Sequence, residues 1–162
     1  MSRLLSSETI HASTVALDGR AVLIIGPSGS GKSDLALRML DRDFTLVSDD
    51  QTIVRRDGDR LIASAPATIA GKLEIRGVGI VEMETVRDVP VALLVELTSE
   101  IQRLPDDRRE RPVLGVKLPL VSCDVVEYTR ATGTMWFAGV PKPGSDSAIG
   151  VPGYPLVDLA RL

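Results

Sequence analysis

The sequence has few aromatic residues, one cysteine, one histidine and no long apolar segment. Because aromatic residues make up only 3% of the chain, a core built from its 44% hydrophobic residues has to be mainly aliphatic. The single cysteine, Cys123, cannot form an internal disulfide, which fits a reducing compartment. No apolar run approaches the roughly 20 residues that span a bilayer, and the first residues lack the apolar stretch of a leader. These absences predict a soluble, cytoplasmic protein with no membrane partner.

The chain also lacks a basic excess, because its formal net charge is −3. Nucleic-acid binding requires a basic surface to meet the phosphate backbone, so the charge argues against a nucleic-acid partner. The length of 162 residues is typical of one domain. We therefore expect a single domain over residues 1–162.

Alternation of apolar runs and turn residues predicts mostly strands. Asp18-Gly19 between apolar runs predicts a hairpin of Thr9–Leu17 with Ala21–Ile25, because both turn positions need positive φ. Apolar residues at helical spacing predict a helix over Lys32–Arg42. The further expected strand regions are Phe44–Val47, a hairpin over Thr52–Ile62 around Asp57-Gly58, Leu73–Val81, Val89–Leu97 and Val113–Val121.

Residues 26–33 satisfy the Walker A pattern G-x-x-x-x-G-K-[ST]. Glycines let successive backbone N–H groups turn inward around phosphate oxygens, and the helix that follows adds its N-terminal dipole. An apolar run before the motif and an amphipathic segment after it supply the expected context. The nucleotide-binding residues that the motif predicts are Gly26, Pro27, Ser28, Gly29, Ser30, Gly31, Lys32 and Ser33.

Two neighbouring aspartates, Asp49 and Asp50, follow the predicted strand Phe44–Val47. Adjacent side chains on a strand point to opposite faces, so the two should not share one role unless the strand has ended. One can face a metal ion while the other faces the phosphoryl group. The alternative is a solvated turn before Gln51.

The only histidine gains interest from the predicted hairpin. If Asp18-Gly19 is a two-residue turn, Leu17 pairs with Arg20, and the same register places His11 opposite Gly26. A histidine there can contact the γ-phosphate or steady a neighbouring carboxylate. The alternative is a histidine at the surface or at the edge of the core.

Glu74 and Arg76 lie two positions apart and so share a face if this segment is a strand. A carboxylate and a guanidinium that point together suit Mg²⁺ and phosphate respectively. The alternative is an exposed ion pair.

Four segments together resemble the catalytic C-terminal domain of the HPr kinase/phosphorylase family. They are Ile10-His11-Ala12, the loop at 26–33, Leu46–Asp50, and Leu73–Ile80 with its sequence LEIRGVGI. The resemblance covers roughly residues 5–122. It implies an α/β fold with a P-loop-containing mixed β-sheet and flanking helices, as in the phosphoenolpyruvate-carboxykinase-like and HPr kinase cores.

The resemblance also implies an activity and a set of roles. The family transfers phosphate from ATP to a serine of the phosphocarrier protein HPr, and removes it with inorganic phosphate. By this resemblance Lys32 binds phosphate, Ser33 and Glu74 bind Mg²⁺, and Asp50 is the general base. His11 lies beside that base, Arg76 contacts phosphate, and Asp49 is the Walker B-like residue near the metal, unless the two aspartates exchange roles. A homo-oligomer, a hexamer by the same resemblance, is implied as well.

The sequence departs from the family pattern in three respects. Because His11 lies so near the start of the sequence, we expect that the N-terminal domain of the family's longer members is absent. No clear match exists for the family's mobile-loop arginine, for which Arg108, Arg109 and Arg111 are candidates by position. The arginine-rich segment associated with dephosphorylation is missing, and residues 125–162, Pro/Gly-rich over 139–155, are unassigned. Two alternatives therefore stay open: a P-loop small-molecule or carboxykinase-like enzyme, and a non-catalytic nucleotide-sensing regulator.

Overall fold

The computed structural model describes residues 6–75, 77–99 and 109–123. These residues form one α-helix and eleven β-strands. The helix is α1 (Lys32–Leu40), and the strands are β1 (Ser7–Ile10), β2 (Ala12–Leu17), β3 (Arg20–Ile25), β4 (Thr45–Ser48), β5 (Thr52–Asp57), β6 (Arg60–Ser64), β7 (Lys72–Ile75), β8 (Gly79–Glu82), β9 (Val89–Leu97), β10 (Glu110–Val113) and β11 (Val116–Cys123).

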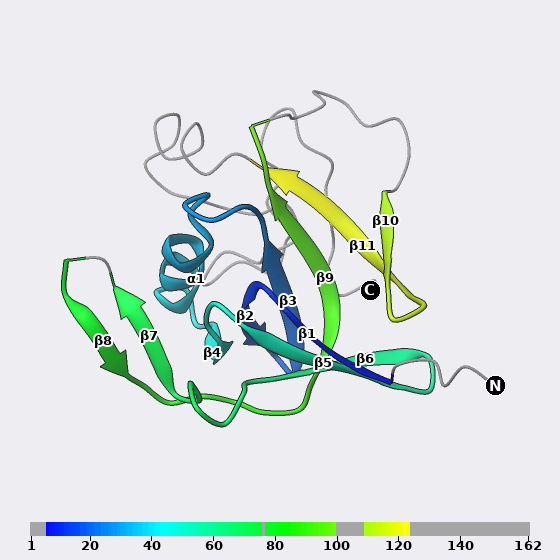
Figure 1. The fold of residues 1–162 in the computed structure, drawn as a ribbon, viewed down its shortest axis with the longest axis horizontal. Helices are drawn as coiled ribbons and strands as arrows, with labels where there is room; N and C mark the ends of the chain where they lie inside the picture. The colour runs from blue at the N-terminus through cyan, green and yellow to red at the C-terminus, as the bar shows by residue number, and fades with distance from the viewer. Residues whose placement is uncertain (1–5, 76, 100–108, 124–162) are drawn as a thin grey trace.

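Nine of the strands form a mixed sheet in the order β1-β5-β6-β9-β3-β2-β4, with β11 paired to β9 and β10 paired to β11. The long strand β9 joins the two halves of this sheet (Figure 1). Its first residues pair antiparallel with β6, and its later residues pair in parallel with β3 and β11. The carboxyl ends of β3, β9 and β11 therefore meet at one edge, which is where ligands bind in sheets of this kind.

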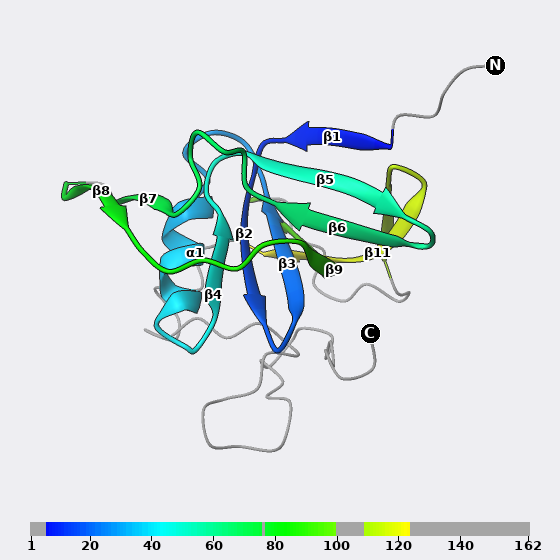
Figure 2. The ribbon, with the colours of Figure 1, turned by 90° about the horizontal axis from the view of Figure 1, so that it is seen from below.

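Both faces of the central strands are buried, and each face has its own core. On one face α1 covers a cluster that includes Leu35 and Met39 of the helix and Ile24 of β3. On the other face β5 and β6 fold over a second cluster, to which Leu23 of β3 contributes (Figure 2). Phe44 is the one aromatic residue among the buried hydrophobic residues that the structure describes. The expectation of an aliphatic core is confirmed for this part of the chain.

The hairpin of β2 and β3 has the predicted register. Leu17 pairs with Arg20, and the ladder continues to Ala12 and Ile25, one pair short of His11 and Gly26. Asp18 and Gly19 have φ values of 50° and 73°, as a two-residue turn of this type requires.

Several predicted boundaries are wrong. Thr9–Leu17 is not one strand, because β1 pairs with β5 and β2 pairs with β3, and the chain passes from one to the other at His11. The segment Val113–Val121 is broken by a turn at Leu114 and Gly115, both with positive φ, so that β10 can fold back on β11. The Thr52–Ile62 hairpin turns at Gly58 and Asp59 rather than at Asp57-Gly58, because Asp57 pairs with Arg60.

Two further segments differ from expectation in extent. The helix ends at Leu40 rather than Arg42, and Asp43 follows with a φ of 68°. The segment Leu73–Val81 is a hairpin of β7 and β8 that projects from the side of the molecule (Figures 1 and 2). The fold class predicted several flanking helices. Within the described residues, α1 is the one helix found.

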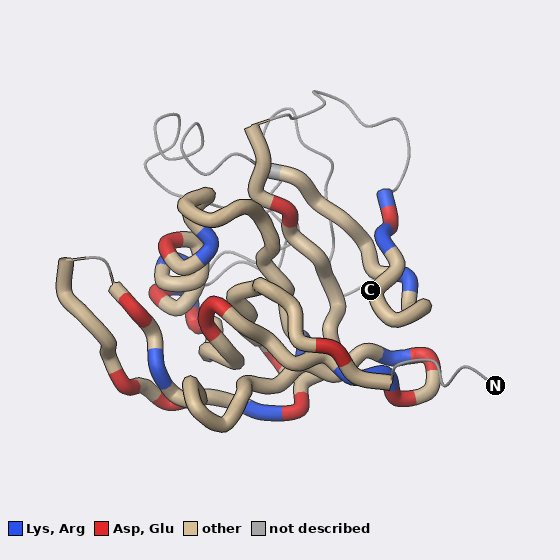
Figure 3. Tube along the Cα trace, viewed as in Figure 1, with Lys and Arg blue, Asp and Glu red and all other residues tan. Residues whose placement is uncertain are grey.

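Charged residues of both signs lie close together on several elements. Figure 3 shows Lys/Arg and Asp/Glu alternating along α1 and around the turn between β5 and β6. Arg38 pairs with Asp34 on the helix, and Arg60 pairs with Asp57 at the turn. Among the described residues, no helix is long and apolar enough to cross a membrane.

Candidate active site

The glycine-rich loop joins the end of β3 to the start of α1, as the motif predicts. Gly26 has a φ of 156°, and a Cβ there would lie 2.7 Å from Ser30 Oγ and 3.0 Å from the carbonyl oxygen of Leu97. Gly31, the residue before the helix, has a φ of 100°. At these two positions the loop therefore needs glycine, one for lack of space and one for its backbone conformation.

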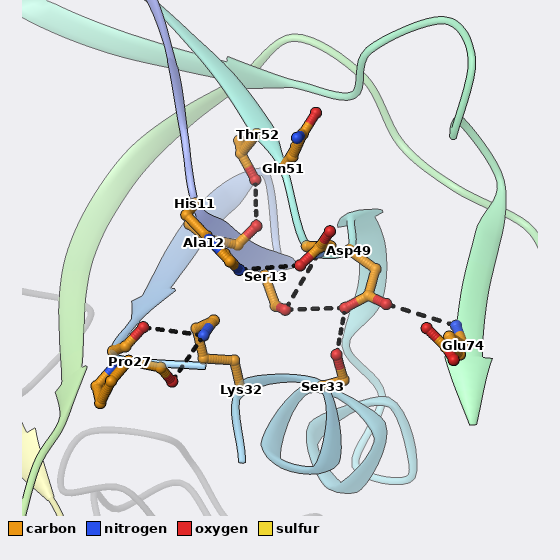
Figure 4. A network of polar contacts seen from close by, with 12 residues as sticks. His11, Ala12, Ser13, Pro27, Lys32, Ser33, Asp49, Gln51, Thr52 and Glu74 are labelled. Atoms are coloured by element: carbon orange, nitrogen blue, oxygen red, sulfur yellow. Dashed lines mark hydrogen bonds and ion pairs between the residues drawn. The ribbon is translucent and has the colours of Figure 1, made fainter. Parts of the chain in front are cut away.

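The start of α1 is open to an anion. Gly31 offers no side-chain cap, so no side chain of this residue satisfies the first N–H groups of the helix. Lys32 is buried, and its Nζ donates to the carbonyl oxygens of Gly26 and Pro27 at 2.9 and 3.1 Å (Figure 4). Within the described residues this ammonium group has no carboxylate partner, so its charge is available to phosphate oxygens.

Asp49 is the centre of the polar network next to the loop. Its carboxylate is buried, and its Oδ1 accepts hydrogen bonds from Ser33 Oγ at 2.7 Å and from Ser13 Oγ at 2.8 Å (Figure 4). The backbone N–H of Glu74 donates to Asp49 Oδ2 at 3.4 Å. Three segments far apart in the sequence are thus joined at one carboxylate: β2, the start of α1 and β7.

Asp50 has the opposite surroundings. The strand β4 has ended at Ser48, and Gln51 N–H donates to the carbonyl oxygen of Asp49 at 2.7 Å, which closes a three-residue turn with Asp50 at its centre. The φ of Asp50 is 66°, a conformation that is rare and strained in such a turn. Its side chain is 68% exposed, and Oδ1 lies 2.9 Å from His11 Nε2.

The turn explains why the two aspartates separate. Because the strand ends before them, the alternation of faces along a strand does not decide their directions. Asp49 points toward Ser33, whereas Asp50 lies beside His11. The histidine reaches this carboxylate because β1 and β2 are interrupted at that residue.

The other predicted site residues fall into two groups. Glu74 is exposed on β7 and reaches the network through its backbone N–H, whereas Arg76 and Arg108 lie outside the described residues. Arg111 donates to Glu96 at 2.8 Å, and Arg109 donates to Ser122 at 3.0 Å. Both of these described arginines are therefore bound to β9 or β11 rather than to the aspartates. Residues 125–162 also lie outside the described residues.

Sequence reasoning gave no role to Ser13, which contacts Asp49 directly. The residue stands in a strand whose other side chains are mostly apolar, so a polar residue at a buried strand position was the available signal. Its partner is 36 positions away along the chain. Only the pairing of β2 with β4 brings the two together.

The oxygen atoms at Asp49 fit a magnesium ion that also binds nucleotide phosphates. Among the described residues, no group of three His, Cys, Asp or Glu side chains could hold a metal by itself. Mg²⁺ is commonly bound by one or two carboxylates together with substrate phosphates, so a cage made only of protein is not required. The Ser33 hydroxyl donates a hydrogen bond to Asp49, which leaves the lone pairs of the Ser33 oxygen free for a cation.

The comparisons with known proteins identify the family of the chain. Residues 2–135 match the family model of the HPr Serine kinase C-terminal domain. The chain belongs to this family. An HPr kinase/phosphorylase of Chlorobium phaeovibrioides is 40% identical over 129 residues, which cover 71% of this chain and 39% of the relative. One of Prosthecochloris aestuarii is 35% identical over 131 residues, or 73% of this chain and 38% of the relative.

A solved structure supports the fold of this family member. The Hpr(Ser) kinase/phosphatase from Coxiella burnetii matches with a TM-score of 0.66 at 29% identity, covering 74% of this chain and 87% of the solved one. The resemblance to the family and the mixed-sheet fold class are confirmed. The chain spans about two fifths of the length of the curated relatives it matches, 39% for the first of them.

Proposed function

We propose that this chain is an ATP-dependent serine kinase that phosphorylates the phosphocarrier protein HPr in the cytoplasm. Its family membership and the HPr kinase/phosphorylase names of its relatives support this activity. The Walker A loop, followed by a helix without a side-chain cap, supports ATP as the phosphate donor.

One observation carries the proposal: two adjacent aspartates have opposite surroundings beside a phosphate loop. Asp49 is buried against Ser33 of the loop, while Asp50 is exposed in a strained turn. A protein substrate can reach only an exposed carboxylate. A base that must take a proton from a serine hydroxyl therefore belongs at Asp50, and a residue that helps to hold the metal ion and orients Ser33 toward it belongs at Asp49.

The chain's residues then act as follows. Lys32 would move from the loop carbonyls to the β- and γ-phosphates. Ser33, Asp49 and Glu74 would hold Mg²⁺, and that ion would supply neutralisation of the phosphate charge. The serine oxygen of HPr attacks the γ-phosphorus, the bond from that phosphorus to the bridging oxygen breaks, and ADP leaves. The serine proton passes to the Asp50 carboxylate, which His11 holds in place.

The same site can run in the other direction with inorganic phosphate as the attacking group. A phosphate oxygen attacks the phosphoserine phosphorus, the bond to the serine oxygen breaks, and pyrophosphate forms. Asp50, now protonated, returns its proton to the serine oxygen. Arg76 is proposed to contact phosphate in both directions, and the active form is proposed to be a homo-oligomer, a hexamer as the family resemblance implies.

The test is a labelling experiment with the full chain. Purified protein is incubated with Mg²⁺, γ-labelled ATP and the HPr protein of the same genome, and the product is analysed for phosphoserine. We expect label on one serine, and its release as pyrophosphate when ATP is replaced by inorganic phosphate. ATP binding without any label on HPr would overturn the proposal and favour a nucleotide-sensing regulator.

A further inference from the structure

Ser13 is a buried polar residue on β2 with a relative exposure of 0%. Burying a hydroxyl is unfavourable unless it finds a hydrogen-bond partner. Its partner is Asp49, whose Oδ1 accepts the Ser13 proton at 2.8 Å. The same oxygen accepts a hydrogen bond from the Ser33 hydroxyl at 2.7 Å, so two hydroxyls donate to one carboxylate oxygen.

We propose that Ser13 is a positioning residue of the magnesium site, an inference that rests on the proposed function. Without Ser13 the Asp49 carboxylate keeps the Ser33 hydroxyl on Oδ1 and the longer 3.4 Å contact from the Glu74 N–H on Oδ2, whereas with Ser13 its Oδ1 is held by hydroxyls from two sides and keeps a single direction. Asp49 in turn fixes where the Ser33 proton points, and hence where the Ser33 lone pairs point. Ser13 therefore sets the direction of a metal-binding oxygen that it does not touch.

The strand that carries Ser13 is itself tied to the turn of the aspartates. Thr52, at the start of β5, donates its hydroxyl proton to the Ala12 carbonyl oxygen at 2.9 Å. Because that proton is used, the contact of 2.7 Å between Thr14 and Thr52 has Thr14 as its donor. Asp50 N–H also points to Ser13 Oγ, at a long 3.5 Å. Ser13 is thus presented by a segment that is bound to the residues after the turn.

The alternative role of Ser13 is purely structural, as a satisfied polar residue in the core. A structural role predicts a change in stability and no change in how ATP binding depends on Mg²⁺. A positioning role predicts that more Mg²⁺ is needed to strengthen ATP binding, because the geometry of the metal ligands is disturbed while the phosphate loop is intact. The two roles can therefore be separated without any transfer assay.

The experiment measures ATP affinity of the full chain by calorimetry at increasing Mg²⁺ concentrations. For Ser13→Ala, we expect the Mg²⁺ concentration of half-maximal effect to rise about tenfold, with ATP affinity in chelator unchanged. Ser13→Thr keeps the hydroxyl and should restore most of the wild-type dependence. Thr14→Val is the matched control, because it removes an equally buried hydroxyl that contacts Thr52 rather than Asp49, while the bond from Thr52 to the Ala12 carbonyl oxygen still ties the strand in place. It should leave the Mg²⁺ dependence as in the wild type.

The outcomes separate this inference from the proposed function. If Ser13→Ala shows the Mg²⁺ dependence of the wild type, the inference is overturned. If ATP binding by the wild type does not depend on Mg²⁺, the inference and the assignment of the metal site are both overturned. Absent transfer to HPr, with the Ser13→Ala shift present, would overturn the proposed function and support the inference. If thermal unfolding shows that Ser13→Ala does not fold, Ser13→Cys takes its place, with the same expected rise, because a thiol is a weak donor.

Discussion

Asp49 and Asp50 are adjacent in the chain, yet they belong to two different regions of the molecule. Asp49 is buried and accepts hydrogen bonds from the hydroxyls of Ser13 and Ser33 and from the backbone N–H of Glu74. Asp50 is exposed and has a positive φ, and its carboxylate lies beside His11. The difference shows how one short turn can give a fixed carboxylate for orienting ligands and an accessible one for a protein substrate.

The cost of this separation is local strain. A non-glycine residue with φ near +60° in a three-residue turn is held there by its surroundings, at about 1–3 kcal/mol. The hydroxyls of Ser48 and Thr52, which hydrogen-bond across and after the turn, supply part of that restraint. Such strain is common where side chains must be aimed at a reacting group.

The largest effect is expected for Asp50→Asn. An amide of the same size cannot accept the serine proton, so transfer to HPr should fall by about a thousandfold, while ATP affinity stays as in the wild type. The measurement is the initial rate of phosphoserine formation together with ATP binding. Asp57→Asn, at an exposed aspartate that ends β5, is the matched control. A wild-type rate in Asp50→Asn would remove this residue from its proposed role.

Lys32→Ala should lower binding and transfer together. The ammonium group is the buried cation of the loop, and its loss should reduce the transfer rate about a hundredfold and weaken ATP binding as well. Equilibrium binding and rates measured on the same preparation check this. Lys117→Ala, an exposed lysine on β11, should change neither quantity. Unchanged ATP affinity in Lys32→Ala would contradict the assignment of the loop.

His11→Gln should have a moderate effect. Its contact with Asp50 is exposed to solvent, and such pairs contribute up to about 1 kcal/mol, which corresponds to a rate loss of about fivefold. Arg38→Gln breaks an equally ordinary ion pair on α1 and serves as the control in the same rate assay. A loss as large as that of Asp50→Asn would mean that His11, rather than Asp50, accepts the proton.

The two aspartates should also differ in what they contribute to stability. Asp49→Asn places an amide where the carboxylate accepts hydrogen bonds from three donors, so the free energy of unfolding should drop by about 1–3 kcal/mol. Asp50→Asn is at an exposed position that tolerates asparagine, and the change should stay within about 0.5 kcal/mol. Chemical denaturation of the two variants compares them directly. Equal losses of stability in Asp49→Asn and Asp50→Asn would contradict the expectation that the buried carboxylate contributes more to stability than the exposed one.

The local structure that could be predicted depended on short-range rules. The Asp18-Gly19 turn fixed the register of β2 and β3, and the motif at 26–33 located the loop and the start of α1. The break at His11 could not be predicted, because it arises from β1 pairing with a strand some 40 residues later, and no Gly or Pro marks it. The turn at Leu114 and Gly115 was missed for a different reason, since leucine is unusual at positive φ.

Part of the predicted set of site residues lies close together in the structure, and the rest of the set keeps the standing of a prediction. His11, Ser33, Asp49 and Asp50 do lie together around one turn. Which aspartate faces the loop depends on the three-residue turn, and neither the strand pattern nor the composition contains that information. Ser13 was missed because a hydroxyl on a strand has meaning only once its partner from β4 is in place.

The Mg²⁺ dependence of ATP binding, measured side by side in Asp49→Asn and Asp50→Asn, tests the division between the two aspartates most directly. We predict that Asp49→Asn loses most of this dependence, whereas Asp50→Asn binds Mg-ATP like the wild type and fails only in transfer to HPr. The reverse result, in which Asp50→Asn loses Mg²⁺ dependence and Asp49→Asn keeps it, would contradict this division of roles.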